Sequence, residues 1–350
     1  MKVNYKFNIG QIVFYEGKAL TIKRKVGNYD IPAYAVMEDI KVYFESELSE
    51  INTLSEYAPE QSDRDMEEEY KTYLQELDDQ YSVLSKYSRN LNLLALKNEL
   101  TPTYGRETEV DKIRTILLRR TKPNPILTGV AGCGKTAIIE ELARTFVNYY
   151  LNTADENIPI IYDLSLNSLV SGTKYRGDFE DRLNSILNLL SRNENIVVFI
   201  DEIHSINDVG NAEGATSAGQ ILKPALARGD IRCIGATTIE EYKKHIATDK
   251  ALARRFSVVN IVPLVGTART NCIEKIVAEY GTYFDIKTDS ISASAIENII
   301  DNIIPETVFP DNVIDIIDET LATAKFKKKN EITISDINTT VSRLTGYLII

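Results

Sequence analysis

One stretch decides the fold, Gly129-Val130-Ala131-Gly132-Cys133-Gly134-Lys135-Thr136, which matches the pattern G-x-x-x-x-G-K-[ST]. A strand-length apolar run, 125–128, precedes it, and residues 137–143 continue with a helical pattern. Glycines let backbone N–H groups curl around a phosphate, and the start of the following helix adds partial positive charge. Lys135 would reach the β- and γ-phosphates and Thr136 would hold Mg²⁺. The stretch therefore predicts a loop that binds the phosphates of ATP.

The loop and one distant carboxylate form the expected nucleotide-binding set. Cys133 occupies a variable position of the loop, and we interpret it as a small filler rather than a reactive thiol, although a helix start lowers the pKa of a nearby thiol. The predicted nucleotide-binding residues are Gly129, Gly132, Cys133, Gly134, Lys135, Thr136, Ala137 and Asp201. The predicted Mg²⁺ ligands are Thr136 and Asp201.

Two acids end a second apolar run. Val197-Val198-Phe199-Ile200 reads as a buried strand, and Asp201 and Glu202 follow it directly. A carboxylate at the carboxyl end of such a strand lies beside the phosphate loop. Asp201 is expected to orient Mg²⁺, and Glu202 to polarise the water that attacks the γ-phosphate.

The order of elements predicts an α/β fold. Apolar runs without polar alternation suit strands that are buried on both faces of a parallel sheet. Such runs occupy residues 125–128, 158–162, 196–200, 231–236 and 258–262. From residue 267 onward the pattern is mainly helical and predicts a small lid, with segments near 272–280, 293–304, 312–327 and 335–344.

The first ninety residues have a different character. Short apolar runs at 12–15, 19–22 and 34–36, separated by glycine and proline, predict a small β domain. Residues 62–94 carry apolar side chains at alternating spacings of four and three, which is typical of a heptad seam. Two interpretations stay open: an amphipathic helix packed on its own domain, or a coiled coil between subunits or with a partner.

The composition limits the possible partners and compartments. The formal net charge is −11, which disfavours nucleic acid as a partner unless a local basic patch exists. Three widely spaced cysteines argue against a disulfide framework and for the reducing cytosol. The sequence shows no signal peptide and no membrane-length apolar run, so we expect a cytoplasmic protein without a membrane partner.

The chain resembles the first ATPase module of the Clp family of AAA+ unfoldases. The resemblance covers about residues 88 to 347 and rests on motifs in family order: Leu91-Asn92, Thr103–Glu107, Leu117–Pro125, the phosphate loop, Asp201–His204, Gly235–Thr238, Ala251–Phe256 and Asp315–Glu319. The predicted domains are a small β domain over 1–51 that binds a partner or substrate, a charged helical or coiled-coil linker over 52–90, a large AAA+ ATPase subdomain over 91–265 and a helical lid over 266–350.

The resemblance implies roles for further residues. Thr238 would be the polar sensor of the γ-phosphate. Arg254 and Arg255 resemble arginine fingers, which would reach the nucleotide of a neighbouring subunit and so require a homo-oligomeric ring, expected to be a hexamer. Residues 172–180 resemble the first pore loop of Clp unfoldases. Its substrate-contacting residues would be Lys174, Tyr175, Arg176 and Gly177, with Tyr175 gripping a polypeptide.

Some features depart from the family pattern. The chain stops at Thr345–Ile350, about where a linker to a second module would begin, so we expect a single-module relative. No hydrophobic docking loop is recognisable, which argues against a peptidase partner. Three functions remain open at this point: an ATP-driven motor that remodels protein substrates, a nucleic-acid loader built on the same ATPase, and an assembly scaffold regulated by ATP.

Overall fold

A four-stranded antiparallel sheet forms near the N-terminus. Its strands pair in chain order, β1–β2–β3–β4. Their bounds are β1 Ile12–Tyr15, β2 Lys18–Lys25, β3 Ala33–Val36 and β4 Val42–Phe44. The three strand runs predicted from sequence fall in β1, β2 and β3, and that prediction is confirmed. The domain boundary near residue 51 stays a prediction.

The computed structural model describes residues 12–15, 18–25, 33–36, 42–44, 59–155, 157–171, 176–207 and 218–346. The chain divides into two units, Met1–Tyr70 and Lys71–Ile350. The long helix α1, Pro59–Gln80, begins in the first unit and ends in the second. Among the described helices, none is both long and apolar enough to cross a bilayer.

The second unit is built on a six-stranded sheet with the order β10-β6-β9-β8-β7-β5. Five strands are parallel, and β5 joins the edge antiparallel to β7. The bounds are β5 Ser88–Asn90, β6 Asn124–Thr128, β7 Ile160–Leu164, β8 Ile196–Ile200, β9 Arg232–Thr237 and β10 Phe256–Asn260. The predicted parallel α/β sheet is confirmed, and β6 and β8 are buried along their whole length.

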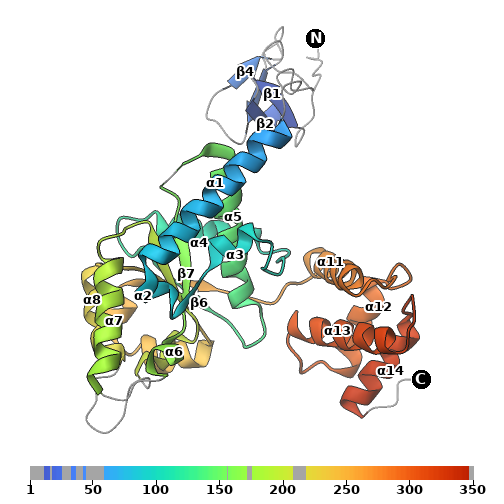
Figure 1. Ribbon diagram of the computed structural model, residues 1–350. Coiled ribbons are helices and arrows are strands. Elements are labelled where there is room, and N and C mark those ends of the chain that lie inside the picture. Colours follow the sequence, from blue (N-terminus) through green and yellow to red (C-terminus); the bar gives the residue numbers. More distant parts are fainter. Residues whose placement is uncertain are drawn as a thin grey trace. The chain divides into compact units, whose positions relative to one another are not determined.

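Helices cover both faces of this sheet, with α3, α4 and α5 on one side and α7 and α8 on the other (Figure 1). The bounds are α2 Ser82–Ser85, α3 Leu91–Leu96, α4 Glu107–Leu117, α5 Lys135–Thr153, α6 Leu166–Val170, α7 Arg176–Leu190, α8 Ala218–Arg228, α9 Ile239–Glu241 and α10 Lys250–Ala253. Two short helical segments complete the set, the 3₁₀ turn η2 Ile203–Asn207 and the π-helical turn η3 Tyr242–Ile246.

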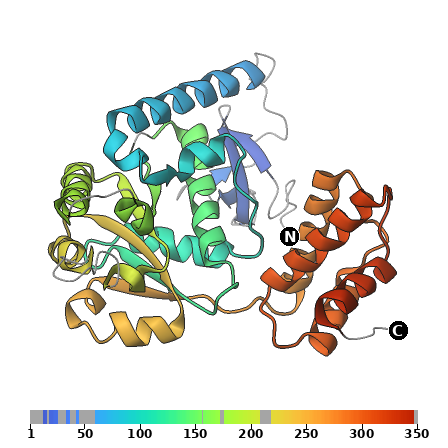
Figure 2. The same cartoon turned by 60° about the horizontal axis from the view of Figure 1, so that its bottom comes forward.

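The predicted helical lid is confirmed as four helices around their own apolar core (Figure 2). They are α11 Thr267–Phe284, α12 Ala293–Ile303, α13 Asp311–Phe326 and α14 Ile334–Thr345. Ile273, Ile296, Val313 and Ile317 are fully buried in this core. Repeating apolar residues at helical spacing explain why all four segments were recognisable in the sequence.

The heptad pattern over 62–94 is not one continuous helix. Helix α1 ends at Gln80, and Ser88-Arg89-Asn90 instead forms edge strand β5 against β7. The Asn90 side chain then caps α3 by accepting a hydrogen bond from the Leu93 N–H at 3.1 Å. Leu74, Leu77 and Leu84 are buried within the second unit. These buried side chains agree with helices that pack on their own domain, and the choice between that and a coiled-coil linker over 52–90 stays a prediction.

A polar cluster around the half-buried Asp78 carboxylate fixes the end of α1 to the sheet. The Tyr162 hydroxyl donates to Asp78 Oδ1 at 2.6 Å, and Asn90 Nδ2 donates to the same oxygen at 2.9 Å. Tyr162 is completely buried, and burial together with the Asp78 hydrogen bond raises the pKa of its hydroxyl. The cluster joins α1, β5 and β7 with hydrogen bonds to a carboxylate, which are stronger than neutral ones.

Replacing Tyr162 with Phe should therefore destabilise the second unit. The variant removes the buried Tyr162 hydroxyl that donates to the half-buried Asp78 carboxylate, and we expect a loss of about 1–3 kcal/mol in the free energy of unfolding. Urea denaturation monitored by circular dichroism measures this. Tyr81→Phe is the control, because the Tyr81 hydroxyl also makes one hydrogen bond, 2.7 Å to Asn193 Oδ1, but at a partly exposed position where water can replace it. Equal losses for both variants would contradict the role of the polar cluster.

Candidate active site

The phosphate loop lies where the sequence predicts it, between β6 and α5. Gly132 and Gly134 have φ angles of +77° and +85°, in the left-handed region that favours glycine. A Cβ on Gly132 would also lie 3.0 Å from Asp311 of α13, so a side chain has no room there. These glycines allow the loop to turn tightly into the first turn of α5, where free N–H groups and the helix dipole favour an anion.

Lys135 and Thr136 bring their side chains to the mouth of this loop. Lys135 Nζ donates to the carbonyl oxygens of Gly129 at 3.2 Å and Val130 at 2.9 Å. Phosphate oxygens would compete with these carbonyls for the ammonium group. Thr136 Oγ1 donates to Asp201 Oδ2 at 2.6 Å, across 65 residues of sequence. The two oxygen-bearing side chains that were predicted to share a metal are therefore in direct contact.

Asp201 and Glu202 leave the carboxyl end of β8 in a tight turn. Asp201 Oδ1 accepts a hydrogen bond from the Glu202 N–H at 2.8 Å. Glu202 has a φ angle of +49°, which is uncommon for a residue with a side chain and is found where function holds a backbone under strain. Its side chain is exposed, so a carboxylate is available to a water molecule in front of the phosphate loop.

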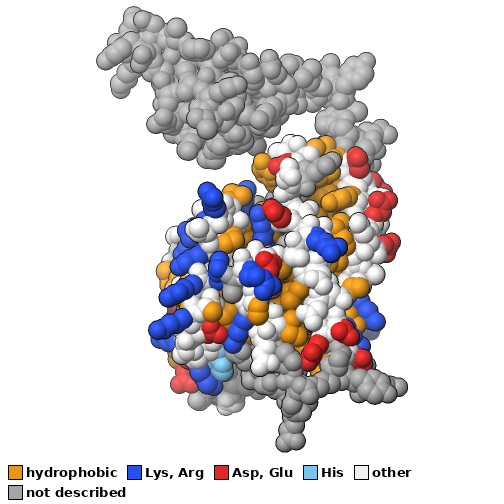
Figure 3. Space-filling model, turned by 90° about the vertical axis from the view of Figure 1, so that its left-hand side faces the viewer, with side chains coloured by type: hydrophobic (Ala, Val, Ile, Leu, Met, Phe, Trp, Pro, Cys, Tyr) orange, Lys and Arg blue, Asp and Glu red, His pale blue; other side chains and the backbone are white. Residues whose placement is uncertain are grey.

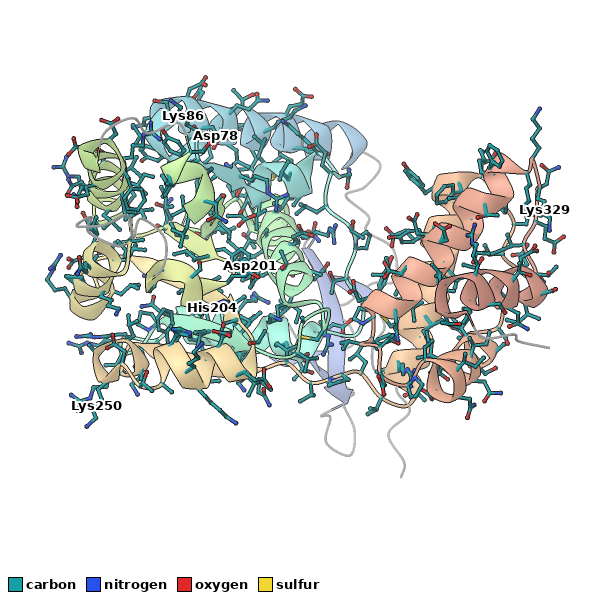
Figure 4. All side chains as sticks on the ribbon, turned by 90° about the horizontal axis from the view of Figure 1, so that it is seen from below. Asp78, Lys86, Asp201, His204, Lys250 and Lys329 are labelled. Atoms are coloured by element: carbon teal, nitrogen blue, oxygen red, sulfur yellow. The ribbon has the colours of Figure 1, made fainter. Side chains whose placement is uncertain are left out.

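A cavity of about 730 Å³ unites these groups, a volume suited to a nucleotide. Figure 4 shows Asp201 and His204, which both line it. From the predicted set, the cavity is lined by Gly132, Gly134, Lys135, Thr136, Ala137, Asp201, Glu202 and Thr238. The lid contributes Pro310, Asp311 and Ile314. Helix α5, the ends of β8 and β9, and α13 therefore surround one space.

Two more carboxylates, Glu140 and Asp163, line the same cavity. Burial raises the pKa of Glu140, and the Arg89 guanidinium opposes that shift. Arg89 also forms an ion pair with Asp163, with 2.7 Å between Nη2 and Oδ2. A cation near this wall offsets the repulsion that acidic groups would exert on phosphates. Among the described residues, no group of three or more His, Cys, Asp or Glu side chains has the geometry of a metal site.

Arg106 is a residue of the site whose role was not predicted. It is only 4% exposed, and its guanidinium donates to the carbonyls of Val262 at 2.7 Å and Cys133 at 3.2 Å. Its guanidinium also forms an ion pair with Glu109, with 3.0 Å between Nη1 and Oε1. Arg106 thus fixes the backbone of the phosphate loop to the segment that follows β10. The sequence motif that contains Arg106 was recognisable. Its contacts were not, because they join residues up to 156 positions apart.

A smaller apolar cavity of about 80 Å³ adjoins the loop. It shares Gly134, Ala137, Pro310 and Ile314 with the main cavity. The remaining walls include Tyr104, Leu264, Cys272, Ile276 and Tyr280. This cavity lies between the lead-in segment and the lid, next to the phosphate loop.

Cys133 is buried, and its Sγ would lie 2.7 Å from a Cβ placed on Gly129. Burial raises the pKa of this thiol despite the nearby Lys135 and Arg106 cations. A raised pKa disfavours the reactive thiolate. The geometry supports the interpretation of Cys133 as a filler of the loop.

Two neighbouring threonines lie at the carboxyl end of β9. Thr237 is the last residue of the strand, and Thr238 follows it. The Thr238 hydroxyl caps α9 by accepting a hydrogen bond from the Glu241 N–H at 3.2 Å. The Thr237 hydroxyl is buried and lies 2.9 Å from His204 Nδ1. Both threonines line the cavity, together with His204. A role for Thr238 as γ-phosphate sensor stays a prediction, and Thr237 and His204 are site residues that were not predicted.

Arg254 and Arg255 are exposed just after α10 and do not line the cavity. Within the described parts of the chain, neither guanidinium forms an ion pair. They belong to a basic face, which also includes exposed cations at the end of α4, in η3 and at the start of α10 (Figure 3). Its members are Arg119, Arg120, Lys122, Lys243, Lys244, Lys250, Arg254 and Arg255. On a chain of net charge −11, this face is suited to an anionic partner group.

The predicted pore loop lies mostly outside the described residues. This holds for Lys174 and Tyr175, and for Arg176 and Gly177 only the backbone is described, as the first turn of α7. Their role in contacting substrate stays a prediction.

Comparisons with known proteins agree with this site. The profile of the "ATPase family associated with various cellular activities (AAA)" matches residues 125–264. Chaperone protein ClpB of Bacteroides thetaiotaomicron is 40% identical over 255 residues, which cover 72% of this chain and 29% of that protein. This chain contains a Clp-family AAA+ ATPase module. The resemblance inferred from the motifs is confirmed.

Two further proteins match about two thirds or more of this chain. The ATP-dependent Clp protease ATP-binding subunit ClpA homolog of Cyanidium caldarium is 41% identical over 237 residues, which cover 67% of this chain and 28% of that protein. The solved structure of the S. cerevisiae Hsp104–ADP complex is 33% identical with a TM-score of 0.66, and the match covers 76% of this chain and 46% of that chain. The chain thus spans less than a third of the length of the ClpB and ClpA relatives.

Glu202→Gln should separate nucleotide binding from hydrolysis. The amide keeps the shape of the side chain but cannot accept a proton from water, so we expect a fall in kcat of about 10²- to 10⁴-fold with ATP affinity retained. Phosphate release measures kcat, and a fluorescent ATP analogue measures binding. Lys135→Ala is the matched contrast, because it removes the phosphate contact and should lose binding itself. If Glu202→Gln hydrolysed ATP at the parent rate, the assignment of Glu202 would be wrong.

Proposed function

We propose that this chain works as an ATP-driven ring motor that remodels or unfolds protein substrates through a central pore. One observation carries the proposal: the cavity collects the phosphate loop, Asp201 and Glu202, whereas Arg254 and Arg255 are exposed and do not line it. A single copy therefore lines its cavity with Lys135 but, among the described residues, with no arginine that would help to neutralise the charge of the transition state. A neighbouring copy that presents its basic face to the cavity would supply such arginines, and repetition of that contact closes a ring.

The nucleotide is proposed to be ATP with Mg²⁺. The residues present fit this ion, because the Thr136 hydroxyl and the Asp201 carboxylate lie in contact within the cavity. Mg²⁺ is usually held by one or two protein oxygens while phosphates and water complete its shell. Bound there, Mg²⁺ would offset phosphate charge. Lys135 would hold the β- and γ-phosphates, and Glu202 would orient the attacking water and accept its proton.

A polypeptide substrate is favoured by the relatives. A solved structure of S. cerevisiae Hsp104 in complex with casein is 32% identical to this chain, with a TM-score of 0.66 over 75% of it. We infer a polypeptide substrate here as well, gripped by Tyr175 in a hexameric ring. Free, buried cysteines at all three positions support a reducing, cytoplasmic location. The N-terminal sheet is proposed to bind a partner or substrate.

The arginine pair offers a test of the ring. A chain carrying Arg254→Ala and Arg255→Ala should still bind ATP, since neither residue lines its own cavity, but should lose roughly 10³-fold or more in kcat. Mixing it with Lys135→Ala chains should restore part of the turnover, because those chains cannot bind ATP yet offer intact arginines to a neighbour. Phosphate release from the mixture measures this. Absence of any recovery at all mixing ratios would contradict catalysis across the interface.

The substrate-gripping role of Tyr175 requires a separate test. Tyr175→Ala should keep the basal ATPase rate and lose stimulation by fluorescein-labelled casein, since an aromatic side chain provides broad contact with any polypeptide. Tyr175→Phe is the control and should keep both. If stimulation by casein survived in Tyr175→Ala, pore-loop threading would be wrong. Stimulation by single-stranded nucleic acid instead, weakening with salt, would favour a nucleic-acid loader.

A further inference from the structure

His204 and Thr237 join two elements of the nucleotide cavity that lie far apart in sequence. His204 belongs to the 3₁₀ turn η2 that follows β8, and Thr237 is the last residue of β9. His204 Nδ1 lies 2.9 Å from Thr237 Oγ1, and both side chains line the cavity. His204 is labelled beside Asp201 in Figure 4.

The Thr237 hydroxyl depends on this contact. Thr237 is 2% exposed, and within the described residues His204 is the one hydrogen-bond partner of its hydroxyl. A buried polar group without a partner is costly, so the pair fixes the rotamer of Thr237 as well as the ring. Either neutral form of the imidazole can make this bond, because a hydroxyl both donates and accepts.

Thr237 also touches the phosphate loop through its backbone. Its carbonyl oxygen accepts a hydrogen bond from the Gly129 N–H at 3.4 Å, and Thr237 lies beside Thr128 in the register of β6 and β9. The end of β9 is therefore placed between the start of the loop and the turn that carries Glu202. A shift of Thr237 would therefore displace both the start of the phosphate loop and the turn that carries Glu202.

The Glu202 turn is attached to β9 at two points. Ile203 packs against Gly235, where an added Cβ would lie only 2.9 Å from Ile203 Cδ1. His204 supplies the second, polar attachment through Thr237. The Ser205 N–H closes the turn by donating to the Glu202 carbonyl at 2.8 Å. Glu202 holds its left-handed backbone conformation within this short, doubly attached segment.

We propose that His204 is a positioning residue for ATP hydrolysis, which acts by bonding Thr237 so that the Glu202 turn and the Thr237 hydroxyl keep their places at the cavity. The proposal rests on the ATPase activity of the module and on Glu202 as the residue that activates water. The role that we assign to His204 is to position Thr237 and the Glu202 turn, not to bind the nucleotide. Its loss should therefore reduce the rate of the chemical step and leave the affinity for ATP close to that of the parent.

The chain contains a matched control in its other histidine. His245 lies on η3 with its ring centroid 6.2 Å from that of His204, and its Nε2 pairs with Glu241 at 3.0 Å. His245 is partly buried like His204 but does not line the cavity. Replacing His245 with Asn tests the loss of an imidazole in nearly the same environment without breaking the bond to Thr237.

The experiment compares kcat, KM and the Kd of a fluorescent ATP analogue for a set of variants in the full chain. His204→Leu and Thr237→Val each break the bond, and we expect each to lower kcat roughly 10- to 100-fold, as small misplacements of catalytic groups do. The double variant should be no slower than the slower single variant, because both remove one interaction. His204→Asn and Thr237→Ser, which keep a polar atom near the same place, should recover most of the rate, and His245→Asn should match the parent.

Several results would overturn the proposal. A His204→Leu chain with the parent kcat would do so, as would fold-losses that multiply in the double variant. A loss of ATP affinity equal to the loss of kcat, or failure of both His204→Asn and Thr237→Ser to recover activity, would show a general structural role instead. If the unaltered chain did not hydrolyse ATP, both the ATPase function and this proposal would be wrong. If the parent and His204→Leu were equally active, this proposal alone would be wrong.

Discussion

The position of β6 between β10 and β9 is the constraint on which the site depends. In a parallel sheet all strands end at the same edge, so the loop after β6 meets the residues that follow β8 and β9. The bond from Thr136 to Asp201 is a direct product of this order. Burial of β6 and β8 on both faces fixes the two strands rigidly, and the apolar runs that made them recognisable in sequence are the same residues that hold the carboxylate opposite the loop.

Strain at Glu202 is tolerated because its surroundings leave few alternatives. A glutamate at φ +49° costs free energy, of the order of 1–3 kcal/mol for such strained residues. The Asp201 carboxylate binds its N–H, and Gly235 leaves space for Ile203 to pack directly on β9. A larger residue than glycine at position 235 would push this turn outward. The position of the exposed Glu202 carboxylate therefore depends on Gly235, a small residue in the interior of the sheet.

The parts predicted from sequence are those encoded by neighbouring residues. The phosphate loop, the acids after β8 and the four lid helices each rest on a local motif or a helical period. Arg106 and the pair of His204 with Thr237 bond partners that are 27 to 156 positions away, and only the folded sheet brings these together. The length of α1 was overestimated for a related reason. A heptad spacing continues through residues 84–94, but pairing of Ser88–Asn90 with β7 outweighs helix propensity there.

The distribution of charge bears on how an acidic chain would bind a triphosphate and, in the proposed ring, share it with another copy. Acidic side chains at the cavity, including Glu140, Asp163, Asp201 and Glu202, would repel phosphates in the absence of cations. Lys135 supplies one cation from within, and Arg89 pairs with Asp163 on the wall. The exposed basic face carries the remaining surplus, including two arginines that form no ion pair within the described residues. Separation of the acidic cavity from the basic face on one chain favours the proposed association of copies electrostatically, and in that ring full neutralisation of the nucleotide would depend on the neighbouring copy.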